Sequence, residues 1–331
     1  DIAVEICNDC KIYLSIRGGQ WFQEKVLGAY EPADMLYNRL VHASLRWWAD
    51  TVFRGFVEVV WGKGGSGIPF WQPHSGYLHG FYNKTREVIT KISQGSIQPR
   101  DEIISIHGNL IQFAGRKSFE HIDYIIFATG YTASHAFPFL HTTYTKVPWY
   151  KLIFYPRDPS LAFVGFARPY LGSIPMLSEL QSRYIAGVWS GESSLPSLAK
   201  MRAEIECDRE NQLKNFPADS KRLPQLVNPY DYCDDVAVKF GAKPRMMNLF
   251  FTNHALWRKL LLQPWSPFQW RINDRDKEKR WLALQQIERL HRHPITIKIK
   301  KILWLVLITH IGAVILFALT LTLGLLLFFK S

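Results

Sequence analysis

Arg17 stands at the C-terminal end of a predicted strand, where a basic side chain has a specific use. Residues 11–17 alternate between apolar and polar side chains and are followed by a pair of glycines. In a dinucleotide-binding βαβ unit, the residue at the end of the second strand faces the adenosine ribose, and an Arg there accommodates the 2′-phosphate of NADP. An exposed Arg at a strand end is the alternative. The glycine pair and the predicted helix before the strand favour the NADP contact.

A second candidate contact with a cofactor lies in an apolar run at residues 121–130, which ends in Thr129 and Gly130. The pattern predicts a buried strand, preceded by a hairpin formed by residues 102–105 and 110–113. Because Gly130 has no Cβ, the backbone at the end of this strand can approach a cofactor closely. A strand that ends in an ordinary turn is the alternative.

Two further motifs have the spacing of known functional motifs, but the residues around them do not support those functions. Gly62–Gly67 fits the spacing GxGxxG, yet Pro69 and Pro73 prevent the phosphate-binding helix that must follow it, so we expect a loop. Cys7 and Cys10 form a CxxC without a second pair of ligands, so no metal site is expected.

The composition limits the kinds of protein that can position these residues. The chain has 331 residues, of which 47% are hydrophobic and 21% charged, which predicts about two globular domains and excludes wholesale disorder. Four cysteines in this length indicate reduced thiols. Lys and Arg number 40 against 28 Asp and Glu, an excess of 12 that suits nucleic acid, a membrane surface or an anionic cofactor.

The distribution of charge favours a membrane. Residues 271–301 contain ten Lys or Arg and four Asp or Glu, whereas the 28 residues of 302–329 contain none of the four. A helix of that length reaches roughly 42 Å, against a hydrocarbon core of about 30 Å. We therefore predict a transmembrane helix at 302–329, preceded by a basic collar at 291–301 that contacts anionic lipid and keeps the body in the cytosol. Nucleic acid is not expected as a partner.

The first residues predict a βαβ unit that is already under way. Residues 1–10 are typical of an amphipathic helix with Ile2, Ile6 and Cys10 on one face, and the strand at 11–17 follows. The first strand of the unit and its glycine turn would precede this helix. We therefore expect the sequence to be a fragment.

Several motifs occur in the order known from the flavin-containing monooxygenases, and the chain resembles that family. The most specific is Phe127-Ala-Thr-Gly-Tyr131, with Phe137-Pro-Phe-Leu140 close behind. Other matching segments are Leu161–Gly165, Leu171–Pro175, Glu179–Arg183, Gly241–Pro244, Leu249–Phe251 and Pro264–Gln269. The apolar tail resembles the microsomal anchor of the animal branch, so the similarity covers nearly the whole chain.

The resemblance implies an enzyme that uses NADPH and FAD to insert one oxygen from O2 into soft nitrogen or sulfur nucleophiles, through a C4a-hydroperoxyflavin. Its partners would be small lipophilic nucleophilic substrates, O2 and membrane lipid, and the oligomeric state is not predicted. The cofactor-binding residues that the resemblance implies are Asp1, Arg17, Thr129, Gly130, Gly165, Gln181 and Arg183. The first two would contact NADP, and the next three would place backbone against a cofactor. The last two are weaker assignments, because an Arg on a helix is more often an ion-pair partner. No catalytic side chain is assigned.

The predicted fold is α/β, with two interlocked Rossmann-like dinucleotide-binding domains, incomplete at the N-terminus, and a C-terminal transmembrane helix. Residues 1–135 are the NADPH-binding domain with an aromatic-rich insertion at about 21–80, and 136–290 are the C-terminal part of the FAD-binding domain. The expected location is the endoplasmic reticulum membrane, as a tail-anchored protein. Two alternatives stay open, namely Baeyer–Villiger oxidation of ketones on the same scaffold and a non-catalytic membrane-anchored remnant.

Overall fold

The computed structural model describes residues 1–16, 18–22, 86–130, 148–216 and 224–290, together with short stretches between residues 26 and 83. Arg17, the basic collar at 291–301 and the predicted transmembrane helix at 302–329 lie outside these residues. Among the described residues, no helix combines the length and the apolar character that crossing a bilayer requires. The anchor therefore stays a prediction.

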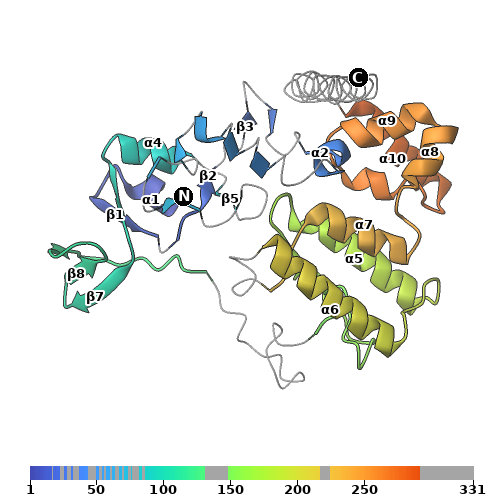
Figure 1. Ribbon diagram of the computed structural model, residues 1–331, viewed down its shortest axis with the longest axis horizontal. Coiled ribbons are helices and arrows are strands. Elements are labelled where there is room, and N and C mark those ends of the chain that lie inside the picture. Colours follow the sequence, from blue (N-terminus) through green and yellow to red (C-terminus); the bar gives the residue numbers. More distant parts are fainter. Residues whose placement is uncertain are drawn as a thin grey trace, which may run out of the picture.

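A small parallel sheet with two helices forms the N-terminal part of the chain (Figure 1). α1 (Ile2–Ile6) precedes β1 (Ile12–Ser15), and α4 (Glu87–Ser93) precedes β6 (Ile97–Arg100). The two strands pair in parallel, with Ile12 opposite Ile97. A helix that leads into a second parallel strand is the arrangement of a βαβ unit. The unit predicted around α1 has its first strand before residue 1 and stays a prediction.

The alternating apolar side chains of β1 pack inward. Ile12, Leu14 and the following Ile16 lie against a core that also contains Phe22 and the fully buried Trp71. The predicted inward face of this strand is therefore confirmed, and the aromatic-rich insertion supplies part of the core that covers it.

The predicted face of the first helix is wrong. Ile2 is 50% exposed and Cys10 is also exposed, whereas Val4 and Cys7 are buried. The reason is length, because α1 ends at Ile6 after five residues, and so a stripe running over ten residues cannot form.

Gly19 is required by a close approach of two backbones after β1. It forms a bridge with Pro73, and a Cβ at this position would overlap the backbone of Gln72. Gly19 thus has a packing role within the described residues, whereas a Cβ at Gly18 would meet no atom within 4 Å.

The described parts of the insertion are short elements. They are β2 (Trp21–Phe22), β3 (Val26–Leu27), β4 (Glu31–Pro32), α2 (Arg39–Ala43) and β5 (Tyr82–Asn83). β2 pairs in parallel with β5, and β3 pairs antiparallel with β4.

An antiparallel sheet of three strands follows β6. β7 (Ile103–His107) and β8 (Leu110–Phe113) form the predicted hairpin, with His107 opposite Leu110, and β9 (Phe119–His121) pairs with β8. Gly108 stands in the turn at a φ of 60°. This hairpin is therefore confirmed.

The strand predicted at 121–130 is wrong beyond His121. Residues 122–130 have no regular secondary structure, and Tyr124 and Phe127 are 89% and 77% exposed. A strand needs a neighbour for its backbone hydrogen bonds. The N–H of Ile122 donates to the carbonyl of Asn109 at 2.8 Å, but no described strand pairs with the residues after it, and so the apolar side chains alone do not make this segment a strand.

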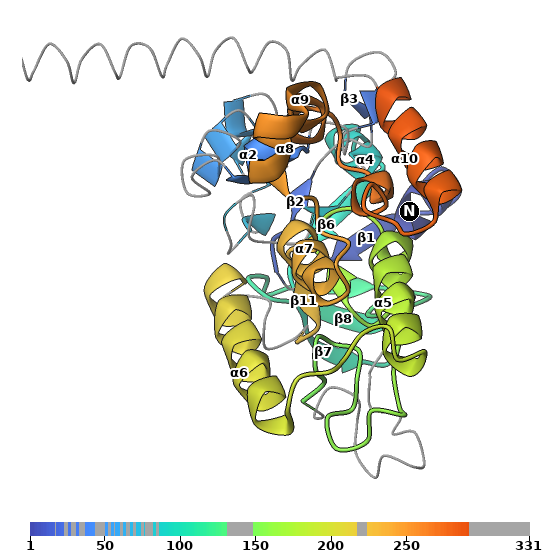
Figure 2. The same ribbon diagram turned by 90° about the vertical axis from the view of Figure 1, so that its right-hand side faces the viewer.

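Helices dominate the chain after residue 148 (Figure 1). The elements are β10 (Arg168–Pro169), α5 (Ile174–Trp189), α6 (Leu198–Asn215), β11 (Leu226–Val227), α7 (Pro229–Lys239), α8 (Met246–Thr252), α9 (His254–Leu262), the 3-10 helix η6 (Pro267–Trp270) and α10 (Lys277–Arg289). β10 and β11 pair in parallel. α5, α6 and α7 lie side by side in both views (Figure 2).

The core of this part lies between α5 and α7. Leu177 and Tyr184 of α5 and Val236 of α7 are fully buried, together with Tyr150 and Phe154 of the segment before β10. The described residues are thus a mixed α/β structure, as the sequence predicts. The two interlocked Rossmann-like domains and the boundary at residue 136 stay predictions.

Candidate functional site

A pocket of about 370 Å³ opens at the start of α5. It is lined by Tyr37, Leu171, Gly172, Ser173, Pro175, Met176, Glu179, Pro229, Tyr230, Trp265 and Pro267. Most of these side chains are apolar or aromatic, which is typical of a site for a small organic molecule. Tyr37 comes from the insertion, and the other residues come from the helical part.

The local sequence leaves the first turn of α5 open toward this pocket. Gly172 has a φ of 91°, a conformation that favours glycine, and a Cβ there would meet Met176 and Trp265 at 3.9 Å. Ser173 is the N-cap residue, but its side chain makes no capping hydrogen bond. The first backbone N–H groups of the 16-residue helix are therefore not capped by a side chain, and they carry the positive end of the helix dipole.

Two stacked rings form an aromatic wall of the pocket. The rings of Tyr230 and Trp265 lie 4.0 Å apart between centroids at an interplanar angle of 27°, and Trp270 meets the edge of Trp265 at 5.1 Å. The Nε1 atom of Trp265 is buried and has no hydrogen-bond partner among the described residues. This N–H is covered by protein atoms and is not exposed to the pocket, so the ring faces, not the N–H, are what the wall offers to a ligand.

The acidic residue of the pocket is paired. Nη2 and Nε of Arg271 lie 2.7 and 2.9 Å from Oε1 of Glu179, and so the carboxylate does not present an unbalanced charge to a ligand. Arg271 also lies 3.9 Å from Asp274. The pocket is therefore close to neutral.

Gly165 and Gln181, both predicted to contact a cofactor, contact each other. The N–H of Gly165 donates to Oε1 of Gln181 at 2.9 Å, and Nε2 of Gln181 donates to the hydroxyl of Tyr232 at 2.6 Å. Gln181 is completely buried, and Tyr232 donates in turn to the carbonyl of Lys151 at 2.7 Å. Gln181 thus holds Gly165 in place by protein contacts.

Gly165 lies against a different face of α5 from the pocket. Its φ is 85°, and a Cβ there would meet Ser178 and Ile174 at 3.6 and 3.9 Å. At 100° per residue, this face is separate from the one that carries Met176 and Glu179 into the pocket. The start of α5 therefore has a glycine on each side, with Gly172 in the pocket and Gly165 opposite.

Arg183 has the structural role that is common for an Arg on a helix. It lies 3.3 Å from Asp274, donates to the carbonyl of Trp270 at 3.1 Å, and covers the ring of Phe240 at 5.1 Å. Burial, followed by the charge of Arg271, lowers the pKa of Arg183. Its guanidinium is occupied by protein groups.

The remaining predicted site residues are exposed or outside the described part. Asp1 is exposed at the start of α1, and its carbonyl accepts from the backbone of that helix. Thr129 and Gly130 are exposed, with Gly130 at a φ of 84°. Arg17 lies outside the described residues. Among the described residues, no hydrogen bond joins Asp1, Thr129 or Gly130 to Gly165.

Sequence reasoning missed the residues that line the pocket, above all Tyr37, Tyr230 and Trp265. Part of the pocket lining could have been found from the sequence, because Leu171–Pro175 and Pro264–Gln269 are among the segments that resemble the family. Nothing in those patterns indicated that the insertion would contribute Tyr37.

Comparison with known proteins identifies the family. Residues 1–328 match the sequence profile described as flavin-binding monooxygenase-like. The chain is 31% identical over 281 residues to flavin-containing monooxygenase 5 of Mus musculus, covering 82% of this chain and 52% of that protein. It is 30% identical over 289 residues to the N-oxide-forming dimethylaniline monooxygenase 2 of Mus musculus, with the same two coverages of 82% and 52%. The chain belongs to the flavin-binding monooxygenase-like family.

The chain spans about half the length of the curated relatives that it matches. The chain is 26% identical to the solved structure of S-allyl-L-cysteine S-oxygenase from Allium sativum, over 58% of this chain and 44% of that chain, with a TM-score of 0.37. Enzymes of the family use FAD and NADPH.

Proposed function

We propose that the protein is a monooxygenase that uses FAD and NADPH to place one oxygen atom of O2 on a soft nitrogen or sulfur nucleophile. The family match over residues 1–328 carries this proposal. In the balanced reaction, NADPH supplies two electrons, one oxygen atom enters the substrate and the other leaves as water. Bound FAD supplies the redox chemistry that connects NADPH to O2.

The start of α5 fits the flat ring of a flavin. A flavin ring carries several acceptor atoms, and the helix offers backbone N–H groups that no side chain caps. Gly165 and Gly172 flank this helix start without a Cβ, which leaves room for a flat group beside the backbone. We propose that these residues hold the ring, with Thr129 and Gly130 as further backbone contacts with a cofactor.

The pocket beside Gly172 suits the substrate. Its aromatic wall, Tyr230 and Trp265, excludes water and stacks with flat or apolar groups. Because Glu179 is paired with Arg271, a neutral lipophilic nucleophile needs no counter-charge in this pocket. The chain's own residues thus bind and orient the substrate and exclude water.

The remaining parts of the proposal come from the sequence. We propose that Arg17 binds the 2′-phosphate of NADPH, as its place after β1 suggests. We also propose that residues 302–329 anchor the protein in the endoplasmic reticulum membrane, with the body in the cytosol. The uncharged run and the ten basic residues at 271–301 support this anchor.

Activity assays on the natural full-length protein test the proposal. With NADPH, FAD and O2, the protein should convert an aromatic tertiary amine and a thioether to their oxides, each with consumption of NADPH. A protein that oxidises only a cyclic ketone to its ester would support the Baeyer–Villiger alternative. A protein that consumes no NADPH with any of the three substrates would contradict the proposal.

A pair of Trp variants tests the pocket. Trp265→Phe keeps a ring but removes part of the aromatic surface that lines the pocket, which should cost about 0.5–1.5 kcal/mol of substrate binding, or roughly a two- to tenfold rise in KM. The control Trp189→Phe lies at the exposed C-terminal end of α5, where the indole donates to the carbonyl of Pro159. Equal KM values for both variants would show that the substrate binds elsewhere.

A further inference from the structure

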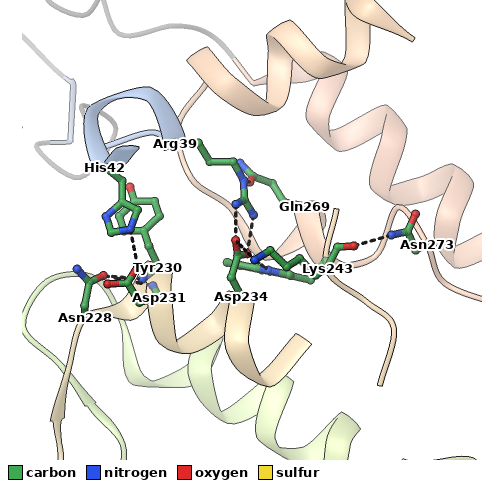
Figure 3. Close-up of polar contacts among 10 residues, drawn as sticks. Arg39, His42, Asn228, Tyr230, Asp231, Asp234, Lys243, Gln269 and Asn273 are labelled. Atoms are coloured by element: carbon green, nitrogen blue, oxygen red, sulfur yellow. Dashed lines mark hydrogen bonds and ion pairs between the residues drawn. The ribbon is translucent and has the colours of Figure 1, made fainter. Parts of the chain in front are cut away.

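An ion pair joins α2 of the insertion to α7 of the helical part, although the two partners are 195 residues apart in the sequence. Nη1 and Nη2 of Arg39 donate to the two carboxylate oxygens of Asp234 at 2.7 and 2.9 Å (Figure 3). The side chains are only 12% and 17% exposed. A bidentate pair with this little access to water fixes the orientation of both partners.

Three neighbouring side chains also contact Arg39 or Asp234. Nε of Arg39 donates to Gln269 at 2.8 Å, and Nε1 of Trp270 donates to Asp234 at 2.9 Å. Lys243 lies 3.6 Å from the same carboxylate. Burial alone would raise the pKa of Asp234, but the hydrogen bonds and charge of Arg39 outweigh burial and lower that pKa. The carboxylate is therefore ionised, and both of its oxygens accept hydrogen bonds from Arg39.

A second contact lies about one helical turn away, after Arg39 in α2 and before Asp234 in α7. Nε2 of His42 lies 2.8 Å from Oδ1 of Asp231, and the imidazole stacks on Tyr230 at 4.6 Å (Figure 3). The spacing of three residues from Arg39 to His42 and from Asp231 to Asp234 places each pair of side chains on one helix face. We call these four residues the α2 latch.

The α2 latch lies directly beside the substrate pocket. Tyr37, two residues before Arg39, lines the pocket, and its carbonyl accepts from the backbone N–H of Trp265 at 3.0 Å. Tyr230 stacks on His42 and also on Trp265. The same short segment of the insertion thus both docks on α7 and supplies one side of the pocket.

We propose that Arg39 is a positioning residue for substrate binding. Its bidentate contact with Asp234 holds α2 on α7 and thereby keeps Tyr37, which forms one side of the pocket, in place. Arg39 does not contact the substrate in this account. A molecule with α2 released lacks the Tyr37 side and binds substrate weakly, so the α2 latch sets the fraction of molecules that are competent to bind. The identity of the ligand rests on the proposed function, whereas the role of the latch does not.

The Asp234→Asn variant of the full-length protein tests this proposal. Asn keeps the shape of Asp but removes the charge that faces Arg39. If one molecule in ten keeps α2 docked, KM for the thioether should rise roughly tenfold while kcat at saturating substrate stays unchanged. Hydrogen–deuterium exchange of residues 37–43 should accelerate, because the released fraction rises from a small value in the wild type to about nine molecules in ten, with no change in the hairpin of β7 and β8.

Further variants separate positioning from a general loss of structure. Arg39→Lys keeps the charge without the bidentate geometry and should raise KM less than Arg39→Gln does. Glu192→Gln removes an exposed pair with Arg275 and should leave KM and exchange unchanged. Unchanged exchange at 37–43 in Asp234→Asn and in Arg39→Gln would overturn the latch, as would a fall in kcat without a rise in KM. An enzyme without oxygenation activity would refute the proposed function, and the exchange measurement would still decide on the latch.

Discussion

Replacement of Lys151 by Met should destabilise the protein more than any single exposed charge can. The side chain of Lys151 is 5% exposed and contacts three carboxylates, with Nζ 2.7 Å from Asp235, 2.9 Å from Asp208 and 3.4 Å from Glu204. Burial alone would lower the pKa of Lys151, but the neighbouring carboxylates, with Asp208 first, outweigh burial and raise that pKa. The lysine is therefore charged at every pH at which the protein is studied.

The expected loss follows from what the variant leaves behind. Removing one partner of a fully buried pair costs about 3–5 kcal/mol. Here Asp208 and Asp235 are 47% and 42% exposed, and Glu204 keeps Lys239 and the hydroxyl of Tyr150 as partners. Because water reaches two of the carboxylates, we expect a smaller loss of about 2–3 kcal/mol. For a domain of this size, this loss lowers the melting temperature by roughly 4–12 °C.

The loss should also depend on pH. Burial raises the pKa of Asp208 above its ordinary value of 3.8 even beside Lys151. A carboxyl group with a raised pKa in the folded state favours folding when protonated, and this contribution is lost as the pH rises above 3.8. Without Lys151 that pKa rises further, so the difference between variant and wild type should be largest at neutral pH and shrink toward pH 4.

Thermal unfolding at several pH values provides the assay, followed by circular dichroism. Lys200→Met, at an exposed position of the same helix that carries Glu204 and Asp208, is the matched control and should change the melting temperature little. If Lys151→Met melts within 1–2 °C of wild type, about the effect of one weak surface contact, the three carboxylates do not depend on this lysine and the reasoning is refuted.

Three other predictions follow from single residues or segments. Arg17→Ala should raise KM for NADPH by roughly 10- to 150-fold, for the loss of one charge-assisted contact of about 1.5–3 kcal/mol, and leave NADH almost unaffected; equal effects on the two nucleotides in steady-state kinetics would sink the assignment. Truncation after Lys301 should move the full-length protein from the membrane pellet to the soluble fraction, and release of the intact protein by alkaline carbonate would show that 302–329 does not span the bilayer. Gln181→Leu leaves the N–H of Gly165 and the hydroxyl of Tyr232 without their shared partner, and should cost about 1–3 kcal/mol in chemical denaturation; a variant as stable as wild type would contradict the structural role of Gln181.

Local pattern was enough to predict the elements whose partners are near in the sequence. The alternation of Ile12 and Leu14 fixes the face of β1 because a strand has a period of two. The hairpin of β7 and β8 follows from two apolar runs around a turn with Gly108. In these two cases the local sequence is enough to determine the secondary structure and the buried face.

The strand predicted at 121–130 failed for the opposite reason. A run of apolar residues forms a strand only where neighbouring strands bury it, because these residues have little intrinsic preference for the extended backbone. The described residues supply no neighbour to it, so Tyr124 and Phe127 stay exposed. The short α1 is a similar case, because its packing against α4 and not its own pattern buries Val4 and Cys7.

The pocket could be predicted only in part. The segments at 171–175 and 264–269 were recognisable by resemblance, because each forms a short continuous motif. Tyr37 and Arg39 gave no such signal, since their roles depend on contacts with Trp265 and Asp234 more than 190 residues away. A single sequence contains no record of pairings at that distance.

Isotopic labelling of the product tests the central claim most directly. The full-length protein is incubated with NADPH, a thioether and isotopically labelled dioxygen, and the product is analysed by mass spectrometry. Our account predicts one labelled oxygen atom in each sulfoxide molecule and one NADPH oxidised for each product formed. A sulfoxide that takes its oxygen from water, or NADPH consumption that yields only hydrogen peroxide, would contradict it.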